Sequence, residues 1–399
     1  MAGLYIHIPF CESRCIYCGF YSTTSLTMQE SYVNALCQEM ELRPLDSIVD
    51  TGEPIETIYL GGGTPSLLTK SHLQQLFQSI QENYLQNYGD KDHSFKGMEI
   101  TMECNPDDVT EAFCKDLKTL PVNRISMGAQ TFSNERLHFL HRRHTAEEVK
   151  IAIERLREVG ISNISIDLMF GFPYETLADW RKDIREALAL HVEHISAYSL
   201  MYEEGTALYK KLAQGKIKEI DEEVSLDMYT LLCDALKEAG YEHYEISNFA
   251  LPGYRSRHNS SYWKEIPYLG IGAAAHSYKR TKHEISRSWN IANVKEYIHS
   301  INQGILPSEK ETLDLKTRYN DLIATALRTS EGIDIDHLRE EFGEEITQHF
   351  LQEAQLKIQQ GLMEEQAPSL HPGKSHQSIR LSKKGIYISD GIMEDFMIV

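Results

Sequence analysis

Two kinds of hydrophobic pattern alternate along the first half of the chain. Short apolar runs rich in β-branched residues are typical of buried parallel strands, and apolar residues at every third or fourth position are typical of amphipathic helices. Strands are predicted at residues 4–10, 55–61, 98–104, 124–130, 164–171 and 194–200. Helices are predicted at residues 28–42, 69–84, 110–120, 145–159, 176–190 and 221–239, with a further short helical turn before the fourth of them. Six strand–helix units in a row predict an α/β fold with a parallel sheet and outer helices.

The pattern changes after about residue 300. Residues 314–329, 334–343 and 346–363 are predicted to form three helices, and residues 377–398 a short strand pair that leads into a terminal helix. Helices followed by a small hairpin indicate a winged-helix-like α+β domain. The chain is therefore divided into domains of residues 1–300 and 301–399. Residues 366–378, rich in Pro, Ser and His, are predicted to form a mobile loop.

Charge limits the choice of partner. The 399 residues carry a formal net charge of −19, and an acidic protein is repelled by phosphate backbones, so we expect no nucleic-acid partner. Winged-helix domains often bind DNA, but residues 301–399 hold 10 Lys and Arg against 17 Asp and Glu. We expect a lid or docking role for that domain. No charged and apolar signal sequence and no apolar run of about 18 residues is evident, so no transmembrane segment and a cytoplasmic location are predicted.

Three of the seven cysteines, Cys11, Cys15 and Cys18, directly follow the first predicted strand. A structural zinc site calls for four ligands, usually in two C-x2-C pairs, and no second pair is present. The other four cysteines stand singly and are expected in the core: Cys37, Cys104, Cys114 and Cys233. Three thiolates on a four-iron cube leave one iron open to a cofactor.

The segment "CESRCIYC", with Tyr17 before its last cysteine, resembles the cluster motif of the radical S-adenosylmethionine (SAM) enzymes. That resemblance implies a 4Fe-4S cluster whose open iron is chelated by SAM. It also implies an open partial TIM-type barrel of six units, in which the chemistry lies on the loops after the strands.

Candidate ligand groups follow the later strands. The second strand ends in the glycine-rich turn "GGGTPS", which resembles the family segment that pairs with the amino group of SAM. Glu103, Gln130 and Asp167 lie at the ends of the next three strands and supply donors and acceptors suited to adenosine and ribose. Arg142 could clamp a carboxylate. Each of these residues has an ordinary alternative as a turn, cap or solvated residue.

A narrower resemblance comes from "YIHIPFC", "GGGTPS", "SMGAQTF" and "IDLMFGFP" in this order. Together they resemble the branch that contains oxygen-independent coproporphyrinogen III oxidase and the HemW-type haem chaperones. The resemblance implies that Cys11, Cys15 and Cys18 hold the cluster. It implies that the SAM pocket is lined by Tyr5, Gly62, Gly63, Thr64, Glu103, Gln130, Arg142 and Asp167, with Tyr17 nearby.

Two departures separate the chaperones from the oxidase. Phe20 stands where the oxidase pattern has a further cysteine, and the chain begins almost at its first strand. Both favour the chaperones.

The segment "HNSSYW" resembles the "HNxxYW" haem-binding signature of the chaperones. His258 would be an axial ligand of the haem iron, with Asn259, Tyr262 and Trp263 beside the porphyrin. The structural alternative is a turn in which His258 forms local hydrogen bonds and Trp263 packs into the core. His276 is the next candidate ligand.

The resulting hypothesis is a protein that carries a 4Fe-4S cluster and SAM, binds haem, and hands it to apo-haemoproteins such as respiratory enzymes. The first alternative is an enzyme that oxidatively decarboxylates coproporphyrinogen III by hydrogen abstraction. The second is a binding module in which the cluster is only a structural staple.

Overall fold

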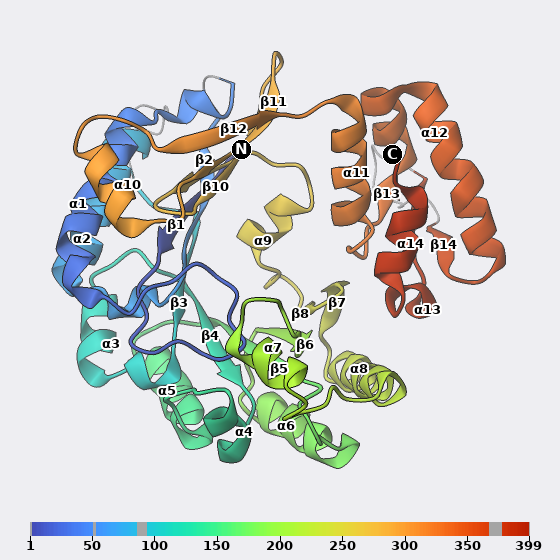
Figure 1. Ribbon diagram of the computed structural model, residues 1–399, viewed down its shortest axis with the longest axis horizontal. Coiled ribbons are helices and arrows are strands. Elements are labelled where there is room, and N and C mark those ends of the chain that lie inside the picture. Colours follow the sequence, from blue (N-terminus) through green and yellow to red (C-terminus); the bar gives the residue numbers. More distant parts are fainter. Residues whose placement is uncertain (1, 51–52, 86–93, 367–376, 399) are drawn as a thin grey trace.

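The computed structural model describes residues 2–50, 53–85, 94–366 and 377–398, and it shows a large α/β part beside a smaller C-terminal part (Figure 1). All six predicted strands are present and pair in parallel in chain order. They are β1 (Ala2–Ile8), β2 (Ile55–Gly62), β3 (Glu99–Cys104), β4 (Arg124–Gln130), β5 (Asn163–Phe170) and β6 (His194–Ser199). Their side chains are mostly buried, as expected of parallel strands covered by helices.

The predicted helices lie on the outside of this sheet (Figure 1). They are α1 (Gln29–Leu42), α2 (Lys70–Ile80), α3 (Glu111–Leu117), α5 (Ala146–Glu158), α6 (Leu177–Ala189) and α8 (Glu222–Glu238). The expected short helix after β4 is α4 (Asn134–Phe139), and α7 (Ala207–Ala213) follows β6. Shorter turns are η1 (Leu26–Met28), η2 (Leu45–Ser47), η3 (Pro65–Leu67), η4 (Gln81–Leu85) and η5 (Pro106–Asp108). Capping boxes at Thr145 and Thr176 fix where α5 and α6 begin.

Short strands extend the sheet on both sides. On one side β9 (Tyr268–Ile271) runs parallel to β1 and is followed by antiparallel β10 (His276–Arg280), β11 (Ile285–Asn290) and β12 (Ser308–Thr312). On the other side β8 (Asn248–Ala250) and β7 (Glu242–Glu245) are added antiparallel to β6. The sheet ends at β12 and β7, so the predicted open partial barrel is confirmed. Helices α9 (Arg257–Tyr262) and α10 (Val294–Ile301) complete this part.

The extension is fixed to the barrel by a buried polar group. The carboxylate of Glu39, on α1, accepts hydrogen bonds from the Arg43 guanidinium, the Asn290 amide and the Tyr297 hydroxyl. It also accepts the backbone N–H of Gly272 at 2.8 Å. A buried carboxylate needs such partners, and these tie α1, β11, α10 and the end of β9 together.

The C-terminal part has its own core around Tyr319, Phe350 and Phe396. Its elements are α11 (Leu315–Ala326), β13 (Ile333–Asp334), α12 (Ile335–Gln359), β14 (Met363–Gln366), β15 (Ser378–Leu381), α13 (Lys383–Ile386) and α14 (Ser389–Phe396). The second and third predicted helices are joined in α12 and separated only by Gly343, whose φ is 81°. The strands form a small antiparallel sheet in the order β13-β15-β14.

One predicted element of this part is wrong. We expected a strand pair within residues 377–398, but β15 pairs with β13 and β14 instead. Residues 383–386 are helical because the Ser382 hydroxyl accepts the N–H of Gly385 and begins a turn. Most of the predicted mobile loop lies outside the described residues, and the division of the chain at residue 300 stays a prediction. Among the helices that the structure describes, none is long and apolar enough to cross a bilayer.

Candidate functional site

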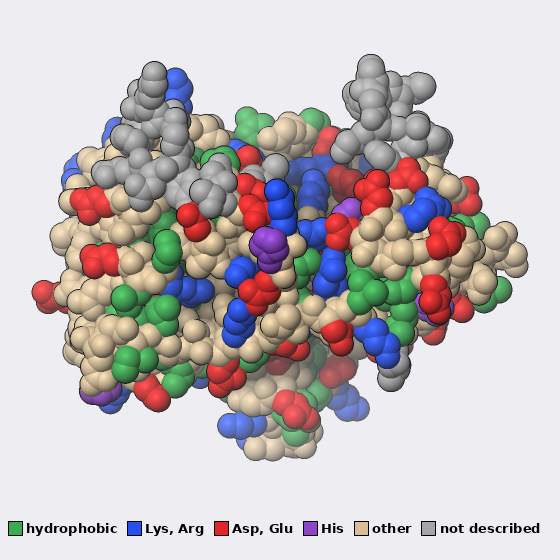
Figure 2. All heavy atoms as spheres, turned by 90° about the horizontal axis from the view of Figure 1, so that it is seen from above, with side chains coloured by type: hydrophobic (Ala, Val, Ile, Leu, Met, Phe, Trp, Pro, Cys, Tyr) green, Lys and Arg blue, Asp and Glu red, His purple; other side chains and the backbone are tan. Residues whose placement is uncertain are grey.

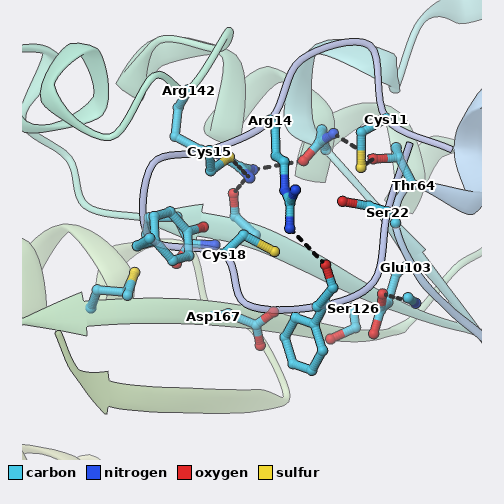
Figure 3. A pocket seen from close by; sticks show the side chains of 18 of the residues that line it. Cys11, Arg14, Cys15, Cys18, Ser22, Thr64, Glu103, Ser126, Arg142 and Asp167 are labelled. Carbon is cyan, nitrogen blue, oxygen red and sulfur yellow. Dashed lines mark hydrogen bonds between the residues drawn. The ribbon is translucent and has the colours of Figure 1, made fainter. Parts of the chain in front are cut away.

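A cavity of about 420 Å³ opens at the carboxyl ends of the parallel strands (Figure 3). The loop after β1 borders it on one side, and residues of β2 to β6 form its walls. Twelve of the predicted site residues line it: Cys11, Cys15, Tyr17, Cys18, Gly62, Gly63, Thr64, Glu103, Gln130, Arg142, Asp167 and Asn259. Residues scattered over some 250 positions of sequence therefore meet in one hollow, as the barrel arrangement predicts.

The three thiols are half-buried in the cavity wall and receive polar support. The Thr64 hydroxyl donates to Cys11 Sγ at 3.7 Å, and Arg142 Nη1 donates to Cys15 Sγ at 3.7 Å. Burial raises the pKa of Cys11 and Cys18, and the Thr64 hydrogen bond opposes that rise at Cys11. Such donors favour the thiolate form that binds metal.

The donor set fits a 4Fe-4S cluster better than a single metal ion. Among the described residues, no three His, Cys, Asp or Glu side chains converge on one point as the ligands of a zinc ion do. The three sulfurs instead border a common hollow that is also lined by the glycine turn and by the carboxyl groups of Glu103 and Asp167 (Figure 3). Three corners of a cluster could take these thiolates and leave the fourth iron facing the cavity.

The turn after β2 has no room for side chains. A Cβ atom on Gly63 would lie 2.7 Å from the carbonyl oxygen of Phe10 and 2.8 Å from that of Ile8. Gly62 has a φ of +109°, and a Cβ there would meet the His7 ring. The two glycines therefore bring the turn close against the cysteine loop, which is where a ligand of the open iron would lie.

Glu103 is fixed at the end of β3 by two donors. Its Oε1 accepts the Tyr59 hydroxyl at 2.8 Å, and its Oε2 accepts the Gly62 N–H at 3.0 Å. Burial raises the pKa of Glu103 to about 7, against the effect of the Tyr59 hydrogen bond. The carboxyl group thus lies in place beside the glycine turn.

Gln130 and Arg142 line the part of the cavity wall that β4 and the segment after it form. Gln130 adopts a φ of 64° at the end of β4, where the pairing with β5 is irregular, so its side chain turns toward the cavity. Arg142 Nη2 donates to Asn105 Oδ1 and to the carbonyl of Gly128, both at 2.7 Å. Since these bonds and the bond to Cys15 engage its terminal nitrogens, Arg142 braces the cysteine loop in this structure; its role as a carboxylate clamp stays a prediction.

Asp167 lies across the cavity from the cysteines, on β5 (Figure 3). Burial raises its pKa to about 6, and the charges of Arg124 and Arg142 oppose that rise. A buried carboxyl group that still ionises near neutral pH is suited to accept hydrogen bonds from ribose hydroxyls.

Tyr5 lies behind the cavity wall and does not line the cavity. Its hydroxyl is 3.0 Å from His7 Nδ1, and its ring stacks at 6.1 Å on Tyr59. Its predicted contact with SAM stays a prediction.

The "HNSSYW" segment lies at the opposite end of the barrel, on α9. The backbone N–H groups of Arg257 and His258 donate to Glu99, the first residue of β3. The His258 ring packs 3.2 Å from the ideal Cβ position of Gly3, at the start of β1. Helix α9 thus closes the amino-terminal end of the barrel and reaches the cavity only through Asn259.

His258 has both ring nitrogens engaged. Nδ1 is 2.8 Å from the Thr57 hydroxyl, and Nε2 is 2.9 Å from the Tyr262 hydroxyl. The ring is buried, which lowers its pKa to about 3, and it stacks 5.1 Å from Tyr59. Trp263 makes an edge contact with Tyr244 at 6.0 Å. The hydrogen bond to Tyr262 is the local bond of the structural alternative, whereas Trp263 is only half-buried and is not part of the core. Iron ligation by His258 stays a prediction and would require at least one of these hydrogen bonds to break.

Several residues at the cavity were not predicted from the sequence to lie there. Phe20 was noted only as a departure from the oxidase pattern. It lines the cavity with Met201 and Tyr198, and these side chains are 71%, 61% and 39% exposed. His141 lines the same cavity with an exposed side chain, and Arg124 lies at its floor. For Phe20, His141 and Met201 the available signal was their position after β1, β4 and β6, because loops after barrel strands carry function. Arg124 is the first residue of β4 and carried no such signal.

Comparisons with known proteins agree with this arrangement. A model of the Radical SAM superfamily matches residues 5–187, and one of the HemN C-terminal domain matches residues 313–388. "Heme chaperone HemW" of Bacillus subtilis (strain 168) is 37% identical over 86% of this chain and 87% of its own length. The chain belongs to the HemW family of radical SAM proteins. The HemW relative of Lactococcus lactis is 32% identical and matches 99% of this chain and 97% of its own length.

The solved structure of coproporphyrinogen III oxidase (HemN) from Escherichia coli superposes with a TM-score of 0.78 at 21% identity. The superposition covers 99% of this chain and 89% of that one, and it shows the shared fold. Membership in the HemW family implies a 4Fe-4S cluster and SAM, in agreement with the prediction.

Proposed function

We propose that this protein is a haem chaperone that binds haem and delivers it to apo-haemoproteins, with a 4Fe-4S cluster and SAM in the barrel cavity. The names of its HemW relatives support haem as the cargo. The residues that line the cavity support a 4Fe-4S cluster and SAM as the cofactors. Cys11, Cys15 and Cys18 would hold the cluster. Bound there, cluster and SAM would supply one-electron chemistry and a radical precursor.

The residues of the chain itself would bind and orient SAM. The glycine turn lets the backbone approach the ligand, and Glu103, held by Tyr59 and Gly62, offers an acceptor for an amino group. Asp167 and Gln130 would contact ribose and adenine from the facing strands. Arg142 would keep Cys15 and the loop in place.

The apolar mouth of the cavity carries the haem proposal. Phe20 and Met201 are more than half exposed, and they line the cavity together with Tyr198. Large apolar side chains gathered at a cavity mouth mark a binding surface, and a flat porphyrin fits such a surface. Phe20 also takes the place of the cysteine in the oxidase pattern, so the position offers a ring in place of a thiol.

One anaerobic experiment tests the proposal. The reconstituted protein is titrated with haem and, separately, incubated with coproporphyrinogen III, SAM and a reductant. We expect saturable haem binding with a defined Soret band and no decarboxylation. Replacing Cys11, Cys15 or Cys18 by Ala should abolish the visible absorbance of the cluster, whereas Cys37→Ala should preserve it. Decarboxylation without saturable haem binding would contradict the proposal.

A further inference from the structure

A basic segment, residues 205–218, lies beside the cysteine loop of a chain that is acidic as a whole. The segment contains four lysines and no acidic residue, whereas the 399 residues together carry 40 Lys and Arg against 59 Asp and Glu. The side chains of Lys210, Lys216 and Lys218 are exposed, and that of Lys211 is half-buried. None of the four forms a salt bridge with a residue that the structure describes. Their charge is therefore open to a partner.

Helix α7 explains only part of this charge. Lys210 and Lys211 lie in its last turn, where the helix dipole stabilises cations. Lys216 and Lys218 lie beyond the end of the helix and receive no such support. The segment therefore presents a positive surface that the stability of the helix does not require, and such a surface attracts anionic partners.

The basic segment is attached directly to the cysteine loop (Figure 1). The backbone N–H of Leu208 donates to the carbonyl of Ile16 at 2.8 Å, and Ile16 lies between Cys15 and Cys18 in the sequence. Ile16 and Leu208 are also buried in one apolar cluster with Ile217, near the other end of the segment. The lysines therefore lie close to the loop that carries the three thiols.

A partner bound to these lysines would lie beside the proposed cluster. One-electron chemistry at the cluster requires an electron from outside the chain, and the donor must come close because the rate of electron tunnelling falls steeply with distance. Redox encounters between proteins use small interfaces that complementary charge steers together. The net charge of −19 repels an anionic membrane from the molecule as a whole, whereas a small acidic protein needs only the basic segment.

We propose that the basic segment is the docking surface for a small acidic redox protein that delivers one electron to the cluster. The proposal rests on the proposed function, which places the cluster on Cys11, Cys15 and Cys18. In the step itself the donor is oxidised by one electron and the cluster is reduced by one, and no group is transferred.

Stopped-flow reduction of the cluster-reconstituted, full-length protein tests the surface. Reduced flavodoxin, a small acidic flavoprotein, serves as the donor, and bleaching of the cluster absorbance gives the second-order rate constant. We expect the triple variant Lys210→Gln, Lys216→Gln and Lys218→Gln to lower this constant at least tenfold at low ionic strength. Added salt should slow the wild type and leave the variant nearly unchanged.

Two controls separate docking from loss of the cluster. Photoreduced deazariboflavin, a small uncharged reductant, should reduce the wild type and the triple variant equally fast. The matched variant Lys237→Gln, Lys295→Gln and Lys384→Gln removes the same charge from exposed positions outside the segment and should behave as the wild type. Wild-type flavodoxin rates in the first variant, or an equal decrease in both variants, would overturn the proposal.

Cross-linking locates the contact without a redox readout. Carbodiimide joins lysines to carboxylates of the bound flavodoxin, and mass spectrometry should find links at Lys210, Lys216 or Lys218. Links confined to other lysines would overturn the proposal. An unaltered flavodoxin rate, together with phosphatidylglycerol vesicles that bind the wild type but not the first variant, would also overturn it and make the segment a membrane site.

Failure of the proposed function gives different results. A chain that holds no cluster lacks visible absorbance in the wild type before any donor is added. A chain that binds no haem still shows the expected flavodoxin rates and cross-links.

Discussion

Tyr59 connects the two ends of the barrel. Its ring stacks 5.1 Å from His258 at the closed end, and its hydroxyl donates to Glu103 at the open end. Glu103 in turn accepts the N–H of Gly62 in the glycine turn. A single side chain thus fixes the carboxyl group that we expect to bind the amino group of SAM.

We predict that Tyr59→Phe weakens SAM binding about tenfold, because Glu103 loses one of two donors while the ring stays in place. Calorimetry on the reconstituted protein gives the dissociation constant, and haem affinity should remain unchanged. Tyr278→Phe, on β10 outside the cavity lining, is the matched control. Equal loss of SAM affinity in both variants would show that Tyr59 has no positioning role.

At the scale of single residues, the sequence identifies those site residues that belong to spaced motifs. Cys11, Cys15, Cys18 and Glu103 were singled out by their place after strands, and the structure brings them to one cavity. The role of Tyr59 depends on which residues face each other across neighbouring strands. The hydrophobic periodicity of the sequence does not show which residues of neighbouring strands lie side by side.

At the scale of elements, α9 carries the haem-ligand prediction, which stays untested. A segment expected to present an imidazole to haem closes the barrel floor, with its backbone bound to Glu99 and its histidine between Thr57 and Tyr262. The segment was expected beside the porphyrin because it resembles the haem-binding signature. In this structure hydrogen bonds also satisfy the His258 ring, and the haem contacts stay a prediction.

We predict that His258→Ala lowers the free energy of unfolding by about 2 to 4 kcal/mol, through loss of buried packing and hydrogen bonds. The haem complex of the folded variant should keep its Soret position. Denaturant unfolding and a haem titration measure the two effects. Thr57→Val and Tyr262→Phe, which each remove one hydrogen bond of the ring, should give smaller destabilisation.

A shifted Soret band in a variant of unchanged stability would support the other interpretation, in which His258 leaves its hydrogen bonds to ligate iron.

The main elements were predictable because the central strands are short runs rich in apolar residues and the outer helices are amphipathic. The edge strands β7 to β12 were not predicted. They are short, and β12 is exposed along its whole length, so they lack a long hydrophobic signal. Helix α13 was mistaken for a strand because β-branched and aromatic residues follow it, while the Ser382 cap decides the conformation.

At the scale of the whole molecule, charged side chains join the barrel to the C-terminal part. Acidic and basic groups alternate along the hollow where the two parts meet (Figure 2). The contacts include Arg255 with Glu331, Arg328 with Glu245, Arg280 with Glu341, His337 with Glu265, and Lys383 with Asp234. Such contacts are partly exposed and screened by salt, so the C-terminal part should detach more readily at high ionic strength.

One of these contacts should depend on pH. A hydrogen bond to Glu265 raises the pKa of His337, burial opposes the rise, and Glu341 supports it while Arg280 opposes it. The pKa of His337 is higher in the docked state than its ordinary value of 6.5. The contact with Glu265 therefore makes its full contribution to stability below pH 6.5. It is lost as the pH rises through the raised value.

We predict that, as the pH rises through the raised pKa of His337, the wild type loses stability relative to His337→Gln. The glutamine keeps a hydrogen-bond donor but carries no titrating charge. Thermal unfolding at several pH values measures the difference. A constant difference between the two proteins across the range would show that this contact does not titrate with docking.

The central claim, delivery of haem, is tested most directly by the kinetics of transfer. The haem-loaded protein is mixed with increasing concentrations of an apo-haemoprotein in a stopped-flow spectrometer, and spontaneous haem loss is measured with an excess of an unrelated haem scavenger. Direct delivery predicts a transfer rate that rises with acceptor concentration and exceeds the rate of spontaneous loss. A rate equal to spontaneous loss at every acceptor concentration would contradict the account, since the protein would then only release haem into solution.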